Sequence, residues 1–194
     1  MKRLISTLSL GLLFSISLPF AANAQTKFIA TAGTVAINGT STLHDWEMSA
    51  QKPAVEAVFV QDASGALSSL NTLSFTLPAE ALKSGKGPMD KNAYKALKTG
   101  ANRNISFVAS QASITPAGAN AYLVKCTGKL TIAGTTRETD LQATCKLNAD
   151  KSLQVSGSKK LKMTDYKVEP PSFAFGTVNT GDAINLIFNL TLKK

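Results

Sequence analysis

The sequence predicts an all-β protein that contains one short helix, and two patterns support this prediction. Apolar and polar residues alternate strictly in about eight or nine segments, as they do in half-buried strands. Only residues 89–98 show instead the wider spacing of apolar residues that is typical of a helix. Many strands with one apolar face each leave a β-sandwich or a closed barrel as the possible architectures.

Residues 1–24 predict a secretory signal peptide that precedes the fold. Two basic residues come before the apolar run 4–20, and the small-residue sequence ANA follows it. Cleavage before Gln25 would export residues 25–194 as a single domain. A retained transmembrane anchor is the alternative, because the apolar run is about 17 residues long.

The mature chain is moderately basic. Loss of Lys2 and Arg3 with the signal peptide lowers the formal net charge from +9 to +7. Nucleic acid is not an expected partner, because the protein is exported and its basic residues are not interleaved with aromatic ones. Anionic lipid head groups, pyrophosphates or an anionic membrane surface suit these charges better, and lysines that only solubilise the strand faces are the alternative.

The predicted elements follow one another along the whole chain. The helix lies between the fourth and fifth strands, and Met89, Ala93 and Leu97 form an apolar stripe on it. Short turns such as AGTT and NADK favour an up-and-down order, and a closed barrel would leave no exposed sheet edge. In chain order the predicted strands are residues 34–38, 46–51, 55–61, 72–77, 104–110, 121–132, 137–147, 152–163 and 183–192.

The sixth and seventh strands form a predicted hairpin around Gly134 in which Cys126 and Cys145 share the apolar face. A two-residue Gly134-Thr135 loop would make the cysteines diagonal neighbours, and a four-residue loop would place them directly opposite. We therefore predict a disulfide between them, with two buried thiols as the alternative. Two thiolates and one distant histidine do not make a zinc site, so we expect no metal.

The inward faces of the strands combine bulky side chains with small ones. If the small residues lie at one level, they leave a tunnel for a slender ligand; otherwise they fit the taper of a packed barrel. The small inward residues are Ala57, Ala109, Gly128, Ala143 and Gly157.

The sequence NGTSTLHDWEMS holds the only histidine and the only tryptophan of the chain, His44 and Trp46. A hydrolase would need His44 as its base, and Ser41 lies nearby in the sequence as a candidate nucleophile. Asp45 cannot orient the ring from the opposite face of an extended strand, and the chain contains no nucleophile elbow or phosphate-binding glycine loop. We therefore expect no catalytic residue, and predict that His44 points inward at the end of a cavity.

Five stretches of the sequence resemble the YceI-like family of periplasmic polyisoprenoid-binding proteins. In order, and over essentially the whole mature chain, they are GTSTLHDWEM, LPAEALKSGKGPMDKNAYKALK, NISFVAS, GKLTIAGTTRETDL and KMTDYKVEPPSFAFGTVNTGDAINLIFNL. The resemblance implies an eight-stranded antiparallel lipocalin-like barrel that holds an amphiphile with a long isoprenoid tail in the periplasm. It also implies no enzymatic reaction, no cofactor besides the lipid ligand, and a homodimer as one form of assembly.

Binding of such a tail requires only apolar surface, because ten buried carbons would contribute on the order of 8 kcal/mol before ordering costs. Lys83, Lys86, Lys91 and Arg103 could contact a head group or only form a solvated helix face. Residues 164–181 are a second candidate for the mouth or a lid. A protein-binding barrel with a dry core is the first alternative function, and a hydrolase that uses His44 is the second. The candidate ligand-binding residues are Ile37, His44, Trp46, Met48, Phe75, Ile105, Phe107, Tyr122, Leu141, Leu161, Met163, Leu186 and Phe188.

Overall fold

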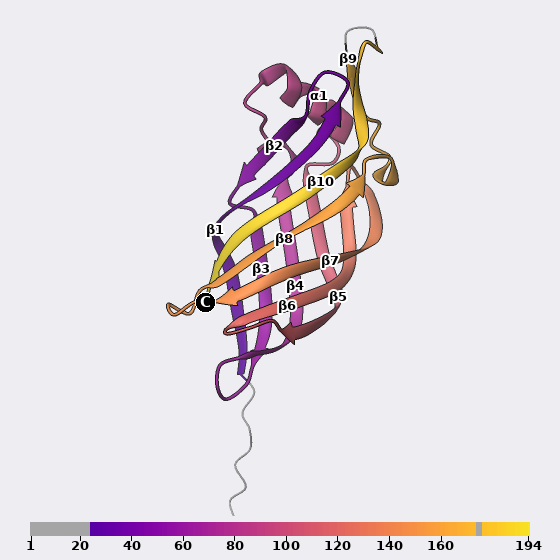
Figure 1. Ribbon diagram of the computed structural model, residues 1–194. Helices are drawn as coiled ribbons and strands as arrows, with labels where there is room; N and C mark the ends of the chain where they lie inside the picture. The colour runs from indigo at the N-terminus through magenta and orange to yellow at the C-terminus, as the bar shows by residue number, and fades with distance from the viewer. Residues whose placement is uncertain (1–23, 174–175) are drawn as a thin grey trace, which may run out of the picture.

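The computed structural model describes residues 24–173 and 176–194. The predicted signal peptide, apart from its last residue, lies outside the described residues. Ten strands, one α-helix and two short 3-10 helices make up the described part of the chain (Figure 1). None of the helices within residues 24–173 and 176–194 has the length and apolar character needed to cross a membrane.

Nine of the ten strands occur at the predicted places and are mostly longer than predicted, whereas the two-residue strand 172–173 was not predicted. The α-helix α1 spans Gly87–Leu97, and the 3-10 helices η1 and η2 span Ala79–Ala81 and Thr164–Tyr166. The strands are β1 (Ala24–Ser41), β2 (Trp46–Gln51), β3 (Ala54–Gln61), β4 (Leu67–Pro78), β5 (Asn104–Pro116), β6 (Ala121–Ile132), β7 (Thr135–Leu147), β8 (Leu153–Lys162), β9 (Ser172–Phe173) and β10 (Val178–Lys193).

Eight of the strands close into an antiparallel barrel. Each of β3 to β7 pairs with the next strand in sequence, β8 pairs with β10, and β10 pairs with β1 along most of its length. The circle is completed by β1, which pairs with β3 over Ala24–Ile29. This order confirms the predicted up-and-down barrel and excludes the sandwich.

Strands β2 and β3 form one wall strand that is interrupted at Lys52 and Pro53. Along β1, residues 24–29 pair with β3, and residues 34–39 pair with β2. The interruption occurs because proline has no N–H to give to the ladder and Lys52 has a positive φ of 52°. Beyond this break, β2 extends the wall toward the helix end of the barrel (Figure 1).

Helix α1 covers the end of the barrel beside β2 (Figure 1). It has Pro88 in its first turn and ends at Leu97, because the next residue, Lys98, has a left-handed backbone that stops the helix. The hydroxyl of Tyr94 donates a hydrogen bond of 2.8 Å to the carbonyl of Leu82, which ties α1 to the segment that precedes it. That segment joins β2 through a bridge between Ser49 and Lys83. The predicted helix is therefore confirmed, and it forms part of the wall at this end.

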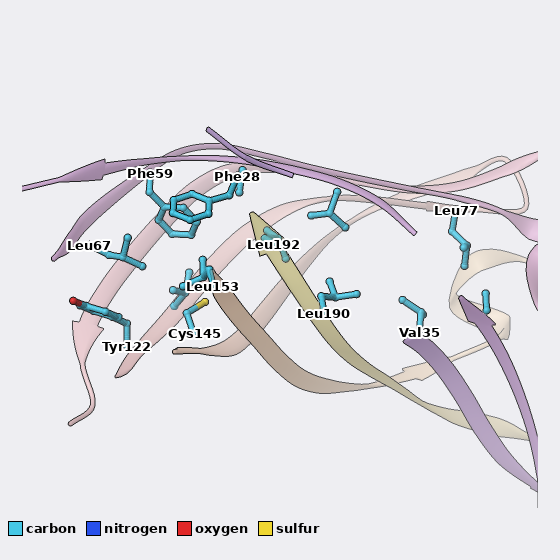
Figure 2. Packing of buried hydrophobic residues seen from close by; sticks show 14 of the residues in the cluster. Phe28, Val35, Phe59, Leu67, Leu77, Tyr122, Cys145, Leu153, Leu190 and Leu192 are labelled. Atoms are coloured by element: carbon cyan, nitrogen blue, oxygen red, sulfur yellow. The ribbon is translucent and has the colours of Figure 1, made fainter. Parts of the chain in front are cut away.

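The opposite end of the barrel is filled by a group of apolar residues that we call the plug. All of its members are at most 6% exposed, and the rings of Phe28 and Phe59 meet edge to face with their centres 5.8 Å apart. Figure 2 shows them gathered at one end of the core. The plug consists of Phe28, Phe59, Leu67, Tyr122, Cys145, Leu153 and Leu192.

The β6–β7 hairpin has a different loop from the predicted one. Ile132 pairs with Thr135, so the two-residue turn is Ala133-Gly134 and not Gly134-Thr135. Both turn residues have positive φ, 49° and 78°, as a type I′ turn requires.

The structure lacks the predicted disulfide, because the true register separates the cysteines. Cys126 pairs with Leu141 and Cys145 pairs with Tyr122, so the two thiols are four residues out of register. Such an offset is roughly 13 Å along a strand, whereas a disulfide joins Cα atoms less than about 7 Å apart. Both cysteines are buried free thiols on the inward face, and burial raises the pKa of the Cys145 thiol to about 12.

The small inward residues have two different roles. A Cβ atom on Gly128 would collide with the ring of Phe107, and one on Gly157 would collide with the ring of Phe188. At these two positions a neighbouring aromatic ring therefore fills the space, and the glycines do not open a tunnel. Ala143, in contrast, borders an open cavity.

Candidate ligand-binding cavity

The described part of the barrel contains two adjoining cavities. The outer cavity, at the helix end, has a volume of about 540 Å³, and the inner cavity has about 170 Å³. Ile37, Leu97, Ile132 and Ile184 line both of them, so these four residues mark the neck where the cavities meet. The two cavities together form one elongated space that leads from the helix end toward the plug.

The inner cavity is apolar throughout. Its lining consists of aliphatic and aromatic side chains with the single thiol of Cys126. Among the predicted ligand-binding residues, those that line the inner cavity are Ile37, Phe75, Ile105, Phe107, Leu141, Leu161, Leu186 and Phe188.

The outer cavity contains most of the other predicted residues. Ile37, His44, Trp46, Met48 and Met163 all line it. Met48 is only 2% exposed and lies deep in this cavity, whereas His44 is exposed at its rim. Strand β2 and the loop before it thus supply one side of the mouth.

Tyr122 is the one predicted apolar residue that lines neither cavity. It belongs to the plug, where it is 6% exposed and pairs with Cys145. Its strand position gives it an inward side chain, as predicted, but at the closed end of the barrel.

Two further segments contribute to the outer cavity, and the predicted residue set does not include them. One is the apolar stripe of α1, with Met89, Ala93 and Leu97. The other is the segment after β8, which the sequence marked as a possible mouth or lid. Its lining residues are Tyr166, Val168, Pro171, Phe173, Val178 and Thr180.

The segment after β8 is fixed in place by two sets of hydrogen bonds. The hydroxyls of Tyr166 and Thr139 lie 2.9 Å apart in a buried position, which holds η2 against β7. Asp182 accepts bonds from the backbone N–H and the hydroxyl of Thr164, at 2.9 and 2.8 Å. These bonds from Thr164 hold the pKa of Asp182 below its usual value.

The polar groups at the rim of the outer cavity are basic or neutral. Lys86 and Lys162 both line it and are exposed, and no aspartate or glutamate occurs among its described lining residues. The predicted head-group residues Lys83, Lys91 and Arg103 do not line it. They lie outside, and the ammonium group of Lys83 is 5.0 Å from the centre of the Tyr94 ring.

The predicted set of ligand-binding residues does not include Lys162, because strand alternation assigns this residue to the outer face of the barrel. Its neighbours Leu161 and Met163 both line a cavity, as their parity predicts. However, β8 ends at Lys162 and Met163 has a helical backbone, so the alternation stops at this point.

The residues around His44 form a turn and not a catalytic relay. The hydroxyl of Ser41 donates to the backbone oxygen of His44 at 2.7 Å and accepts the backbone N–H of the same residue at 3.2 Å. The ring Nδ1 atom of His44 lies 2.7 Å from the backbone oxygen of Asp45, so this nitrogen donates. The hydroxyl proton of Ser41 is therefore directed to a carbonyl and not to the imidazole.

Several solved structures share this fold. BcnA from Burkholderia cenocepacia has a TM-score of 0.65 and 20% identity, over 82% of this chain and 95% of that one. A polyisoprenoid binding domain from Saccharophagus degradans, implicated in plant cell wall breakdown, has a TM-score of 0.64 and 12% identity, over 86% and 97%. The YCEI protein of Campylobacter jejuni has a TM-score of 0.53 and 20% identity, over 72% and 81%.

At these identities the structural similarity establishes the fold alone. A comparison with curated proteins found no match. The model of the YceI-like domain matches residues 21–192, which is nearly the whole chain, and the chain therefore belongs to the YceI-like family.

Proposed function

We propose that this protein binds and carries a long-chain isoprenoid-type amphiphile in the periplasm without catalysing a reaction. The observation that carries the proposal is the elongated apolar space that opens at the helix end and stops at the plug. The name of the Saccharophagus degradans domain, polyisoprenoid binding, supports the choice of ligand class. The turn geometry at His44 supports a binding role, because the hydroxyl of Ser41 donates to a backbone oxygen and not to the only imidazole of the sequence.

Burial of the tail supplies the affinity. Each buried methylene contributes about 0.8 kcal/mol, so a tail of ten carbons offers on the order of 8 kcal/mol before ordering costs are subtracted. Without a ligand, the side chains around the inner cavity also lack packing contacts. This lack destabilises the fold by about 24 cal/mol for each Å³ of cavity volume. A volume of about 170 Å³ then corresponds to roughly 4 kcal/mol that a tail recovers when it fills the space.

The head group then lies in the outer cavity, near its rim. Lys86 and Lys162 provide two positive charges there without a carboxylate among the described lining residues, which favours a phosphate, a pyrophosphate or another anionic head group. The exposed groups Lys83, Lys91 and Arg103 lie on α1 or in the segments that flank it, outside the cavity lining. They suit contact with an anionic membrane surface while the ligand enters or leaves.

Organic extraction of the protein purified from the exported fraction, followed by mass spectrometry, tests the proposal. We expect a near-stoichiometric amphiphile with an isoprenoid tail. The matched control is residues 25–194 produced in the cytoplasm, which we expect to lack that lipid if loading occurs after export. Exported protein without any co-purified amphiphile would contradict the proposal and favour the protein-binding barrel.

A further inference from the structure

The elongated cavity is closed at one end by residues that are fully packed. Val124 and Leu190 line the inner cavity and are 4% and 6% exposed; we call these two residues the floor. On β6 and β10 the floor residues stand two positions from the plug residues Tyr122 and Leu192, on the same face. Figure 2 shows Leu190 between the plug and Leu77. A tail that enters from the mouth therefore meets the floor before the plug.

The walls of the inner cavity are also held in fixed positions. The rings of Phe107 and Phe188 lie against Gly128 and Gly157 on the neighbouring strands, where no other side chain could fit. Protein interiors are close-packed, so a longer tail cannot make room by displacing the rings of the plug. The inner cavity thus has a defined depth.

The outer cavity is built from more adaptable side chains. The mature chain has three methionines, Met48, Met89 and Met163, and all of them line the outer cavity. Methionine is unbranched and polarizable, and it adapts to ligands of different shape. The mouth can therefore accommodate different head groups, whereas the closed inner end limits the length of the tail.

We infer that the floor formed by Val124 and Leu190 sets the length of tail that the protein selects. Methylene groups that fit between the rim and the floor add to affinity, because both cavities have mostly apolar linings. Any further ones push the head group out past the rim and add nothing. This inference rests on the proposed function, since it assumes that the tail enters the inner cavity.

A homologous series of straight-chain alkyl phosphates tests this inference, used below their critical micelle concentrations. Trp46 provides the readout, because it is the only tryptophan and lines the outer cavity. We expect affinity to rise about fourfold with each added methylene until the tail reaches a certain length, and to remain constant for longer tails. We call that length the break. Leu190→Ala removes three side-chain carbons from the floor and should move this break to tails about three methylenes longer.

Leu153→Ala is the matched control, because Leu153 is 0% exposed in the plug and lines neither cavity. It should destabilise the fold like Leu190→Ala and leave the break unchanged. If Leu190→Ala does not fold, Val124→Ala provides the same test with a smaller shift. A steady rise without a break, or a break that stays in place in the floor variants, would overturn the inference while leaving the binding function intact. Absence of binding at every chain length would refute the proposed function, and the inference with it.

Discussion

Ala143 lies on β7, where it pairs with Val124 and Gly157 and its methyl group borders the inner cavity. A leucine at this position would place three additional carbons in the open volume. In a solid core such a change causes overpacking, but here it fills space that the empty protein leaves vacant. We therefore expect Ala143→Leu to stabilise the ligand-free protein and to weaken ligand binding.

The magnitudes follow from the volume of the added side chain. Burial of three carbons contributes about 2.4 kcal/mol, and loss of leucine rotamer freedom costs about 0.5–1 kcal/mol, which leaves a net gain of roughly 1.5 kcal/mol. For a domain of this size the melting temperature should rise by roughly 3–6 °C. The same three carbons exclude three methylenes of the tail, so affinity for a long-tailed amphiphile should fall about fiftyfold.

Thermal unfolding of the ligand-free protein and fluorescence titration of Trp46 measure the two effects. Ala57→Leu is the matched control, because Ala57 is 2% exposed and lines neither cavity. It should destabilise the protein by about 1–3 kcal/mol and leave affinity unchanged. If Ala143→Leu behaves like Ala57→Leu in both assays, the inner cavity does not hold the tail and the reasoning fails.

Three other predictions concern the mouth and the core. Tyr166→Phe leaves the buried hydroxyl of Thr139 without its partner and should cost about 1–3 kcal/mol in urea unfolding; an unchanged midpoint would show that this bond is dispensable. Burial raises the pKa of the Cys145 thiol to about 12, so iodoacetamide should modify the native protein at about pH 8 far more slowly than the unfolded chain, and equal rates would contradict the buried position. Bonds from Thr164 lower the pKa of Asp182, so its stabilising contribution is complete above the unfolded pKa and is lost as pH falls through the lowered value. Denaturation between about pH 5 and pH 2 should show a smaller acid-induced loss of stability in Asp182→Asn than in the wild type, and identical losses would contradict this reasoning.

The sequence predicted part of every barrel strand, because a half-buried strand must alternate. Residues 183–192, for example, lie within β10 and supply inward side chains to both cavities and the plug. Residues 24–33 of β1, which include the pairing with β3, were not predicted. The register of the β6–β7 hairpin could not be obtained in the same way. A shift of two residues keeps every side chain on its face, so parity allowed a close Cys126–Cys145 pair that the Ala133-Gly134 turn does not produce.

The lining of the candidate site was predicted only in part, because it too was predicted from alternation. Alternation shows which face a side chain occupies but not its depth along the barrel, which is why Phe188 was placed correctly and Tyr122 was not recognised as part of the plug. The apolar stripe of α1 was visible in the sequence. Its position over the mouth depends on tertiary packing, and so does that of Lys162, where the strand ends.

The central claim is that the ligand tail lies in the inner cavity with its end against the floor. A crystal structure of the protein with an alkyl phosphate that carries bromine on the last carbon of its tail tests this claim most directly. We expect the anomalous bromine peak inside the barrel, in contact with Val124 and Leu190. A bromine peak at the rim beside Lys86 and Lys162, or on the outer surface of the barrel, would contradict the claim.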